Sequence, residues 1–152
     1  MADSRRQTIA AAIKTRFASI TTGNGYETNI GSKCFLWKTG AWEADELPGV
    51  DIRDMKDDIE GKSAGLRKEL HKLRVEAEVA CKSGTTTAYQ VRKMIADIYT
   101  AIGVDRTWGG IARTTDAVGD EMGVEQQNRT LGGAKVTFIV EYTTAYFDPY
   151  TA

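Results

Sequence analysis

Apolar residues recur at helical spacing in two parts of the chain. The first series follows Ser4, which forms a capping-box pattern with Gln7, and the second follows Thr87, which is paired in the same way with Gln90. We therefore expect two amphipathic helices, each with one buried stripe. The stripes are Ile9, Ile13, Phe17 and Ile20 in the first helix and Ala88, Val91, Ile95, Ile98 and Ile102 in the second.

Strict alternation of apolar and polar residues identifies two strands. Residues 73–81 place Leu73, Val75, Ala77, Val79 and Cys81 on one face, and residues 134–142 place Ala134, Val136, Phe138, Val140 and Tyr142 on one face. Three shorter runs are less regular: CFLW at 34–37, residues 47–52 beginning around Pro48, and residues 111–122. We expect these to be strands as well, with the strand at Pro48 starting there or lying at an edge.

A glycine-rich turn, TTGNGYETNIG, joins the first helix to the run CFLW. A phosphate-binding loop has the opposite order, because its glycines follow a strand and lead into a helix N-terminus. We expect this turn to reverse the chain, with Gly23 as the helix C-cap and with glycines at positive φ. Gly103 is expected to close the second helix in the same way.

The segment of residues 38–65 is longer than an ordinary connection between two elements. It carries an ELPGVDI run followed by the charged sequence RDMKDDIEGK. We predict a long loop or hairpin here, with an exposed, mobile second half. Long polar connections frequently carry function.

The order of elements is helix, two or three strands, helix, two strands. This order predicts an α/β (α+β) domain with two helices packed on one face of a mixed, largely antiparallel sheet. A chain of 152 residues without a Pro-, Ser- or Gly-rich linker is expected to form a single domain over 1–152.

Composition narrows the class of protein. The sequence contains no apolar run long enough to span a bilayer and no continuous apolar core of a secretory signal at its start, so we expect a cytosol-like compartment and no membrane partner. The net charge of −1 gives no bulk attraction for nucleic acid. Residues 1–96 hold 16 basic and 13 acidic side chains, whereas residues 97–152 hold 4 and 8, so the C-terminal part is acidic.

The residue types needed for catalysis or metal binding are sparse. His71 is the one histidine, and its polar context ELHKLR indicates a surface residue rather than a catalytic base. Cys34 and Cys81 lie far apart without metal-ligand spacing, so we expect two buried, reduced thiols and no disulfide. The acidic run Asp54, Asp57, Asp58 and Glu60 does not have calcium-loop spacing. We predict no catalytic residue, no metal and no cofactor.

The three tryptophans have different contexts. Trp37 ends an apolar run and is expected in the core, whereas Trp42 and Trp108 lie in the loop sequences TGAWEAD and DRTWGGI. Aromatic residues presented by loops are frequent anchors of protein interfaces. The candidate partner-binding residues are therefore Trp42, Asp54, Asp57, Asp58, Glu60 and Trp108.

Five sequence features occur together in an order typical of one family of proteins. They are RRQTIAAAIKTRFASITTGNGYETNIG, ELPGVDI, LRVEAEV, IADIYTAIGVDRTWGGIARTTD and GAKVTFIVEYTT. In their order and spacing they resemble the tail-terminator, or tail-completion, proteins of long-tailed, lambda-like bacteriophages.

The resemblance implies a small structural subunit and not an enzyme. Such proteins form a ring, typically a hexamer, that caps the completed tail tube, ends its growth and offers a surface to the head connector. The implied partners are other copies of the chain, the tail-tube protein and the connector or stopper protein. DNA passes through the lumen without specific binding, and the subunit is assembled in the host cytoplasm and located in the virion. The resemblance supplies no functional residue, so the candidate residues above rest on their sequence context.

Two alternatives remain open at the level of sequence. Another neck component, such as a head-tail joining or stopper protein, shares the small size and the ring assembly. A small-molecule-binding or hydrolytic α/β domain is less well supported, because it needs convergent polar groups in a concave site.

Overall fold

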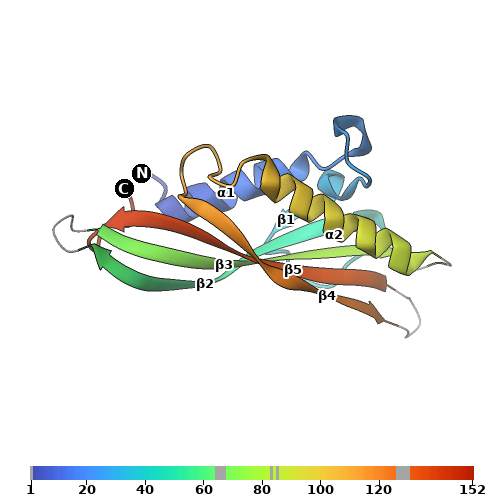
Figure 1. Ribbon diagram of the computed structural model, residues 1–152. Coiled ribbons are helices and arrows are strands. Elements are labelled where there is room, and N and C mark those ends of the chain that lie inside the picture. The colour runs from blue at the N-terminus through green and yellow to red at the C-terminus, as the bar shows by residue number, and fades with distance from the viewer. Residues whose placement is uncertain (1, 64–67, 83, 85, 126–130) are drawn as a thin grey trace.

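The chain forms two helices and one sheet, with both helices on the same face of the sheet (Figure 1). The computed structural model describes residues 2–63, 68–82, 84, 86–125 and 131–152. The helices are α1, Arg5–Ala18, and α2, Thr87–Val104. The strands are β1, Cys34–Leu36; β2, Gly49–Ser63; β3, Lys68–Lys82; β4, Thr114–Glu125; and β5, Leu131–Ala145.

The sheet has the strand order β1-β2-β3-β5-β4. β1 pairs with β2 in parallel, and the other neighbours are antiparallel. The predicted α+β class, with two helices on one face of a mixed, largely antiparallel sheet, is confirmed. Among the described residues, no helix is both long and apolar enough to span a membrane.

The core lies between the helices and the sheet. Both predicted helical stripes and both alternating strands contribute buried side chains to it, as expected from their periodicity. Phe17 of α1 packs edge-on against Phe138 of β5 and against Trp108, with ring centroids 6.1 and 6.2 Å apart. Aromatic pairs at this spacing and angle are favourable beyond the area that they bury.

The ends of the helices differ from the prediction in detail. Ser4 Oγ accepts a hydrogen bond from the amide of Gln7, as the capping pattern requires. Thr87, in contrast, turns its hydroxyl back to Gly84, so the predicted second capping box is wrong. α2 continues to Val104, one residue beyond the predicted end at Gly103.

The glycine-rich turn packs tightly against the end of α1. α1 ends at Ala18 with Ser19 as its cap, so Gly23 is not the C-cap; it lies in a short 3-10 helix, Thr22–Asn24. A Cβ at Gly31 would lie 2.5 Å from the Phe17 carbonyl oxygen. Glycine is required at this position because the backbone passes directly over the last carbonyls of the helix.

The largest difference between the predicted and the observed element boundaries is at β2. Residues 49–63 form a strand of 15 residues that pairs with β3 from Gly49 opposite Ala80 to Ser63 opposite Lys68. The segment of residues 38–65 therefore supplies one arm of a hairpin whose other arm is β3, and the exposed, mobile loop predicted for its second half is wrong. Two register shifts, between Asp54 and Lys56 and between Ile59 and Gly61, break the alternation that would have identified this strand.

Candidate functional site

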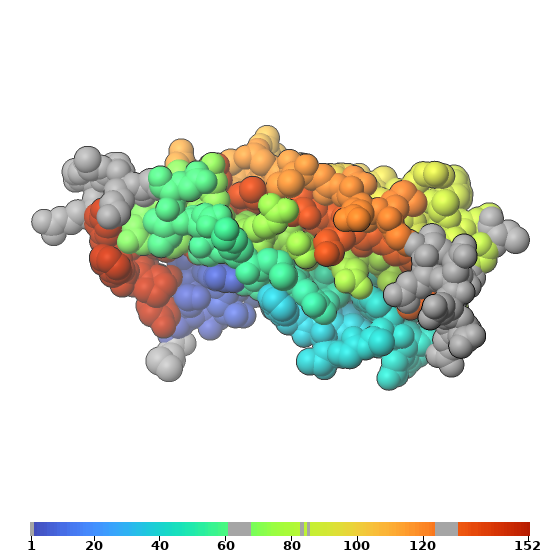
Figure 2. All heavy atoms as spheres, turned by 90° about the horizontal axis from the view of Figure 1, so that it is seen from below, coloured from blue at the N-terminus to red at the C-terminus, as the bar shows by residue number. Residues whose placement is uncertain are grey.

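The face of the sheet away from the helices is open and carries charged side chains. Cross-strand and neighbouring charges form ion pairs on it, including Arg53 with Asp51 at 2.8 Å and Lys135 with Glu76 at 3.6 Å. Figure 2 shows this face, with the segment of residues 37–48, in cyan, standing out from the sheet near one end. Because these charged side chains are hydrated, this face of the sheet can lie in water without a second layer of helices to cover it.

Trp42 belongs to this projecting segment and folds back onto the open face. Its indole Nε1 donates to Glu78 Oε1 of β3 at 2.9 Å. Its ring lies so close to β2 that a Cβ at Gly49 would be 2.8 Å from Trp42 Cζ3. The predicted partner residue Trp42 is half-buried against its own sheet.

A hollow of about 630 Å³ lies beside Trp42. Its walls come from residues 38–42, the C-terminal end of β3, and the adjoining ends of β4 and β5. Trp42 and Leu131 supply apolar surface, and the charged residues of the lining are Lys38, Asp51, Arg53, Glu78, Glu121 and Lys135. Met122 borders the hollow as well, but it is opposite the buried residue Ala134, so its side chain lies on the other face of the sheet. A hollow of this size falls in the range of sites that hold a small ligand or a few side chains.

The cations that line the hollow are already paired. Lys38 Nζ lies 3.1 Å from Glu46 Oε1, and Arg53 and Lys135 have the acidic partners given above. The hollow also contains acidic lining residues. It therefore lacks the concentrated positive charge that binding a phosphate group would need.

A buried polar cluster lies at the other end of the sheet, on the face that the helices cover. His71 Nδ1 is 3.1 Å from Asp57 Oδ2, and His71 Nε2 is 2.8 Å from Thr144 Oγ1. Tyr142 stacks on the His71 ring, with centroids 4.5 Å apart, and donates its hydroxyl to Asp57. Glu69 Oε2 lies 3.7 Å from His71 Nε2. The prediction of a surface histidine is wrong, because His71 is only 8% exposed.

Asp57, His71 and Thr144 have the connectivity of an acid, a base and a hydroxyl nucleophile. Thr144 is, however, only 2% exposed, so a substrate cannot reach its Oγ1 while the surrounding side chains stay packed. Burial, together with the hydrogen bond to Asp57, raises the pKa of Tyr142. The arrangement is that of a buried hydrogen-bonded network, which orders the elements that contribute to it. Asp57 Oδ1 is buried and has no hydrogen-bond partner among the described residues.

The four acidic candidates do not form one site. Asp54 pairs with Arg6 of α1 at 2.7 Å, and Asp57 points into the buried cluster. Asp58 and Glu60 are exposed and pair with Lys56 and Lys72. The two faces of β2 separate these residues, since successive side chains of a strand point in opposite directions.

Trp108, the other predicted partner residue, is in the core. It is 2% exposed, and its indole Nε1 donates to Thr115 Oγ1 at 2.8 Å. The loop context misled the interpretation because this turn folds back onto Phe17 and the sheet. Three hydrogen bonds from Thr107 and Gly109 to the Asp105 carboxylate hold the turn and lower the pKa of Asp105 to about 2.

Trp37 shows the opposite error, since it was expected in the core and is 47% exposed. Its Nε1 donates to Asp54 Oδ1 at 2.7 Å, and the Arg53 guanidinium lies 5.4 Å from its ring centre. Met55 and Ile59 are also exposed and follow on β2, where no strand of the described part of the chain pairs with its outer side beyond Ile52. We refer to Trp37, Met55 and Ile59 as the β2-edge patch.

The opposite edge of the sheet is β4. Val118 and Met122 are exposed on it, and we refer to them as the β4-edge patch. β4 contains four acidic residues and no basic residue. Asp120 accepts a hydrogen bond from the Tyr99 hydroxyl at 2.8 Å, which ties this strand to α2.

The chain leaves β5 through a compact turn at residues 145–151 that displays Phe147. Phe147 is 92% exposed and has φ +50°, a left-handed conformation that costs a bulky residue about 1–2 kcal/mol. The Asp148 carboxylate accepts hydrogen bonds from the Thr151 hydroxyl and from the Tyr150 amide, which lower its pKa. Phe147 was not among the predicted candidate residues; the signal for it was an aromatic residue directly before Asp-Pro, a turn-forming pair.

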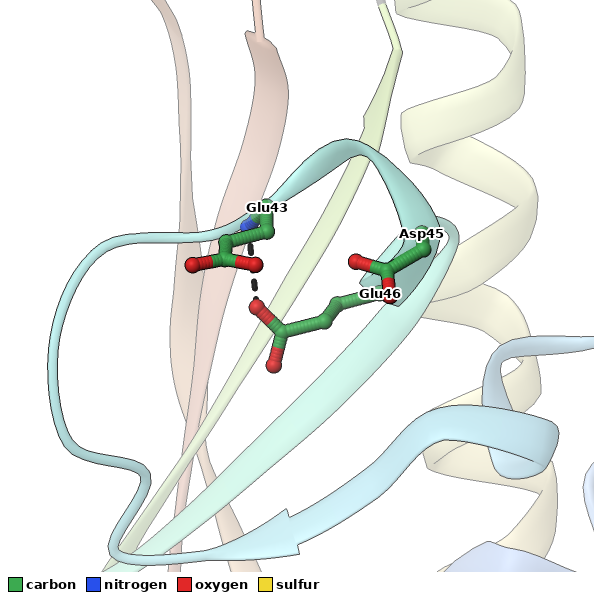
Figure 3. A group of neighbouring side chains, drawn as sticks. All are labelled: Glu43, Asp45 and Glu46. Carbon is green, nitrogen blue, oxygen red and sulfur yellow. Dashed lines mark hydrogen bonds between the residues drawn. The ribbon is translucent and has the colours of Figure 1, made fainter.

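Three acidic side chains, Glu43, Asp45 and Glu46, lie close together in the short 3-10 helix before β2 (Figure 3). Their arrangement has a structural cause, because Glu46 accepts from the Glu43 amide at 2.9 Å and Glu43 caps the helix in return. The Glu46 carboxylate is also paired with Lys38. The hydrogen bond from the Glu43 amide is the largest cause of the lowered pKa of Glu46.

Comparison with known proteins adds no assignment to this geometry. No protein-family model matches the chain, and no significantly similar curated protein was found.

Proposed function

We propose that this chain is a structural virion protein that forms a ring, a hexamer in the family that it resembles, and caps the tail tube of a long-tailed bacteriophage. The ring ends polymerisation of the tube and gives the head connector a surface to attach to. The partners are other copies of the chain, the tube protein and the connector or stopper protein.

The observation that supports this function best is the pair of edge patches on opposite sides of the sheet. A strand edge presents unpaired amide and carbonyl groups, and exposed apolar side chains make it a favourable site for contact with another protein. The β2-edge patch contains a tryptophan beside Arg53, whereas the β4-edge patch is aliphatic and lies among acidic residues. A ring between a tube and a connector needs two unlike surfaces of this kind.

The charge of the sheet agrees with a ring through which DNA passes. β4 contains four acidic residues and no basic residue, and Arg53 and Lys135 on the open face are paired with carboxylates. A channel wall with this charge repels the phosphates of DNA. Because it does not bind them, no counterions are released from the DNA and no binding free energy is gained. The DNA would pass without specific binding.

Another neck protein, such as a head-tail joining or stopper protein, is the alternative that shares the same features. A hydrolytic domain has one observation in its favour, the order Asp57–His71–Thr144. The burial of Thr144 weighs against it. A terminator and a stopper differ in phenotype, because loss of a terminator lets tails grow too long.

The experiment is complementation of a phage that lacks this gene with variants of each edge patch. Ile59→Lys and Val118→Lys place a charge on an exposed position of β2 or β4, so the subunit is expected to fold. We expect one variant to yield overlong tails and the other to yield tails of normal length without heads, both seen by electron microscopy.

Val104→Lys is the matched control, because Val104 is an exposed valine, even more exposed than Val118, and lies at the end of α2 rather than on an edge strand. This variant is expected to give normal phage. If both edge variants also give tails of normal length with heads attached, the proposed function is wrong.

A further inference from the structure

Phe147 is held in place and is not a side chain on a loose end. The Phe147 turn closes through hydrogen bonds from Asp148 N to Ala145 O and from Ala145 N to Thr151 O. A further bond from Arg5 N to Pro149 O fastens it to the first residue of α1. The turn thus holds a bulky residue at positive φ with its ring in water. Strain that the surrounding structure maintains is typical of a residue with a binding role.

The hollow beside Trp42 lies at the opposite end of the sheet. It includes Leu131, where β5 begins, whereas the Phe147 turn follows Ala145, where β5 ends. The full length of β5 separates the two features, as Figure 1 shows for the two ends of this strand. One copy of the chain therefore presents an aromatic projection at one end and an open recess at the other.

We propose that Phe147 of one copy inserts into the hollow beside Trp42 of the next copy, and that this contact joins the subunits head to tail. This inference rests on the proposed function, because it names the contact between neighbours in the ring.

The two features match in size and chemistry. Trp42 and Leu131 offer apolar surface to a phenyl ring, and a hollow of about 630 Å³ has room for an aromatic side chain. The cations of the hollow are paired and need no anionic ligand. An aromatic side chain that packs on another aromatic residue inside a pocket with a polar rim is a frequent form of an interface anchor.

A contact between unlike surfaces determines the type of assembly. A symmetric dimer buries the same patch on both copies, whereas a projection and a recess at opposite ends join each copy to two different neighbours. Such a chain of contacts closes into a ring if each step rotates by the same suitable angle. The edge patches of β2 and β4 then remain available for the tube and the connector.

Two variants test the Phe147 projection and the hollow beside Trp42 independently. Phe147→Ser removes the projection and leaves the hollow open. Gly123→Trp is designed to fill the hollow and leaves Phe147 in place; Gly123 lines the hollow, and a Cβ at this position meets nothing within 4 Å. Tyr89→Ser, at another exposed aromatic residue, and Gly123→Ala are the controls.

The experiment is analytical ultracentrifugation of the full chain up to its solubility limit, with circular dichroism to check folding. We expect the wild type and both controls to associate as concentration rises and each variant alone to remain a monomer. An equimolar mixture of the two variants is expected to form a dimer and nothing larger, because one intact projection meets one intact recess.

A wild type that stays monomeric at every concentration, a Phe147→Ser protein that associates normally, or a mixture without dimers would overturn the inference. None of these outcomes affects the proposed function, which is tested by tail length and head attachment. Conversely, the mixture can form dimers even if the edge variants give normal phage. The two proposals can therefore fail separately.

Discussion

At the scale of single residues, Asp57 is central to the buried polar cluster. It accepts hydrogen bonds from His71 and Tyr142, and both of these rings are buried. A buried donor that loses its acceptor costs more than the bond itself contributed, because water cannot replace the partner.

Asp57→Ala is accordingly expected to lower the free energy of unfolding by about 1–3 kcal/mol. Asp58→Ala is the matched control, since Asp58 is the next residue, exposed, and paired only with Lys56. Its effect is expected to stay within about 0.5 kcal/mol. Urea unfolding curves measure both, and equal midpoints for the two variants would contradict the role given to Asp57.

The cysteines are both free, as predicted, although Cys34 is half-buried rather than buried. Burial raises the pKa of Cys34 to about 11 from 9.0 and raises that of Cys81 as well. Because the thiolate is the reactive form, a rise of this size lowers the reaction rate at pH 8 about 100-fold.

We expect iodoacetamide to modify the native protein slowly at pH 8 and to modify two thiols after unfolding without a reductant. Mass spectrometry counts the added groups over time. Fast modification of Cys34 in the native protein, or an unmodified cysteine pair after unfolding, would show that this description of the thiols is wrong.

At the scale of elements, sequence periodicity correctly predicted the helices and strands that face an apolar core. It did not predict the strand whose buried face carries polar side chains. β3 and β5 follow their alternation over most of their length, and both helical stripes are buried. β2 was misread because its inward positions include Asp54 and Asp57, which face Arg6 and His71 instead of hydrocarbon. Its two register shifts added to the error.

The aromatic candidates were misread for a related reason. A tryptophan in a loop sequence can be buried by long-range packing, as Trp108 is against Phe17, and one in an apolar run can be exposed, as Trp37 is at an edge strand. Nothing local distinguishes the two cases. Trp42, predicted to be a partner-binding residue presented by a loop, is half-buried against its own sheet.

The packing of α2 on the sheet gives a direct test of the core. Ile95 lies in the buried stripe of α2, and Ile95→Ala is expected to lower the free energy of unfolding by about 2–5 kcal/mol, as other large-to-small core substitutions do. Arg92→Ala, on the exposed side of the same helix, is the control. An Ile95→Ala protein with the urea midpoint of the wild type would mean that α2 does not pack as described.

At the scale of the whole molecule, the sheet is much longer than it is wide. β3 and β5 have 15 residues each, so they extend about 50 Å, whereas five strands side by side span about 24 Å. The direction in which copies join therefore determines the size of the ring.

Six copies joined head to tail are expected to form a ring about 95 Å across, measured at the level of the sheet, whereas six copies joined edge to edge would give about 45 Å. Negative-stain images of rings assembled on tube ends distinguish these values. A ring of the smaller size would favour contact through β2 and β4 and contradict the head-to-tail arrangement.

The close crossing at Gly31 has a consequence for the evolution of the chain. Any side chain at this position would collide with the last carbonyls of α1, and Gly49 meets a similar obstacle beneath Trp42. Surface residues can change freely between relatives, but these two glycines, eighteen positions apart and bracketing β1, cannot change without moving a helix or a loop. A pattern built on them, with CFLW between, would identify descendants of this fold after most of the remaining sequence has diverged.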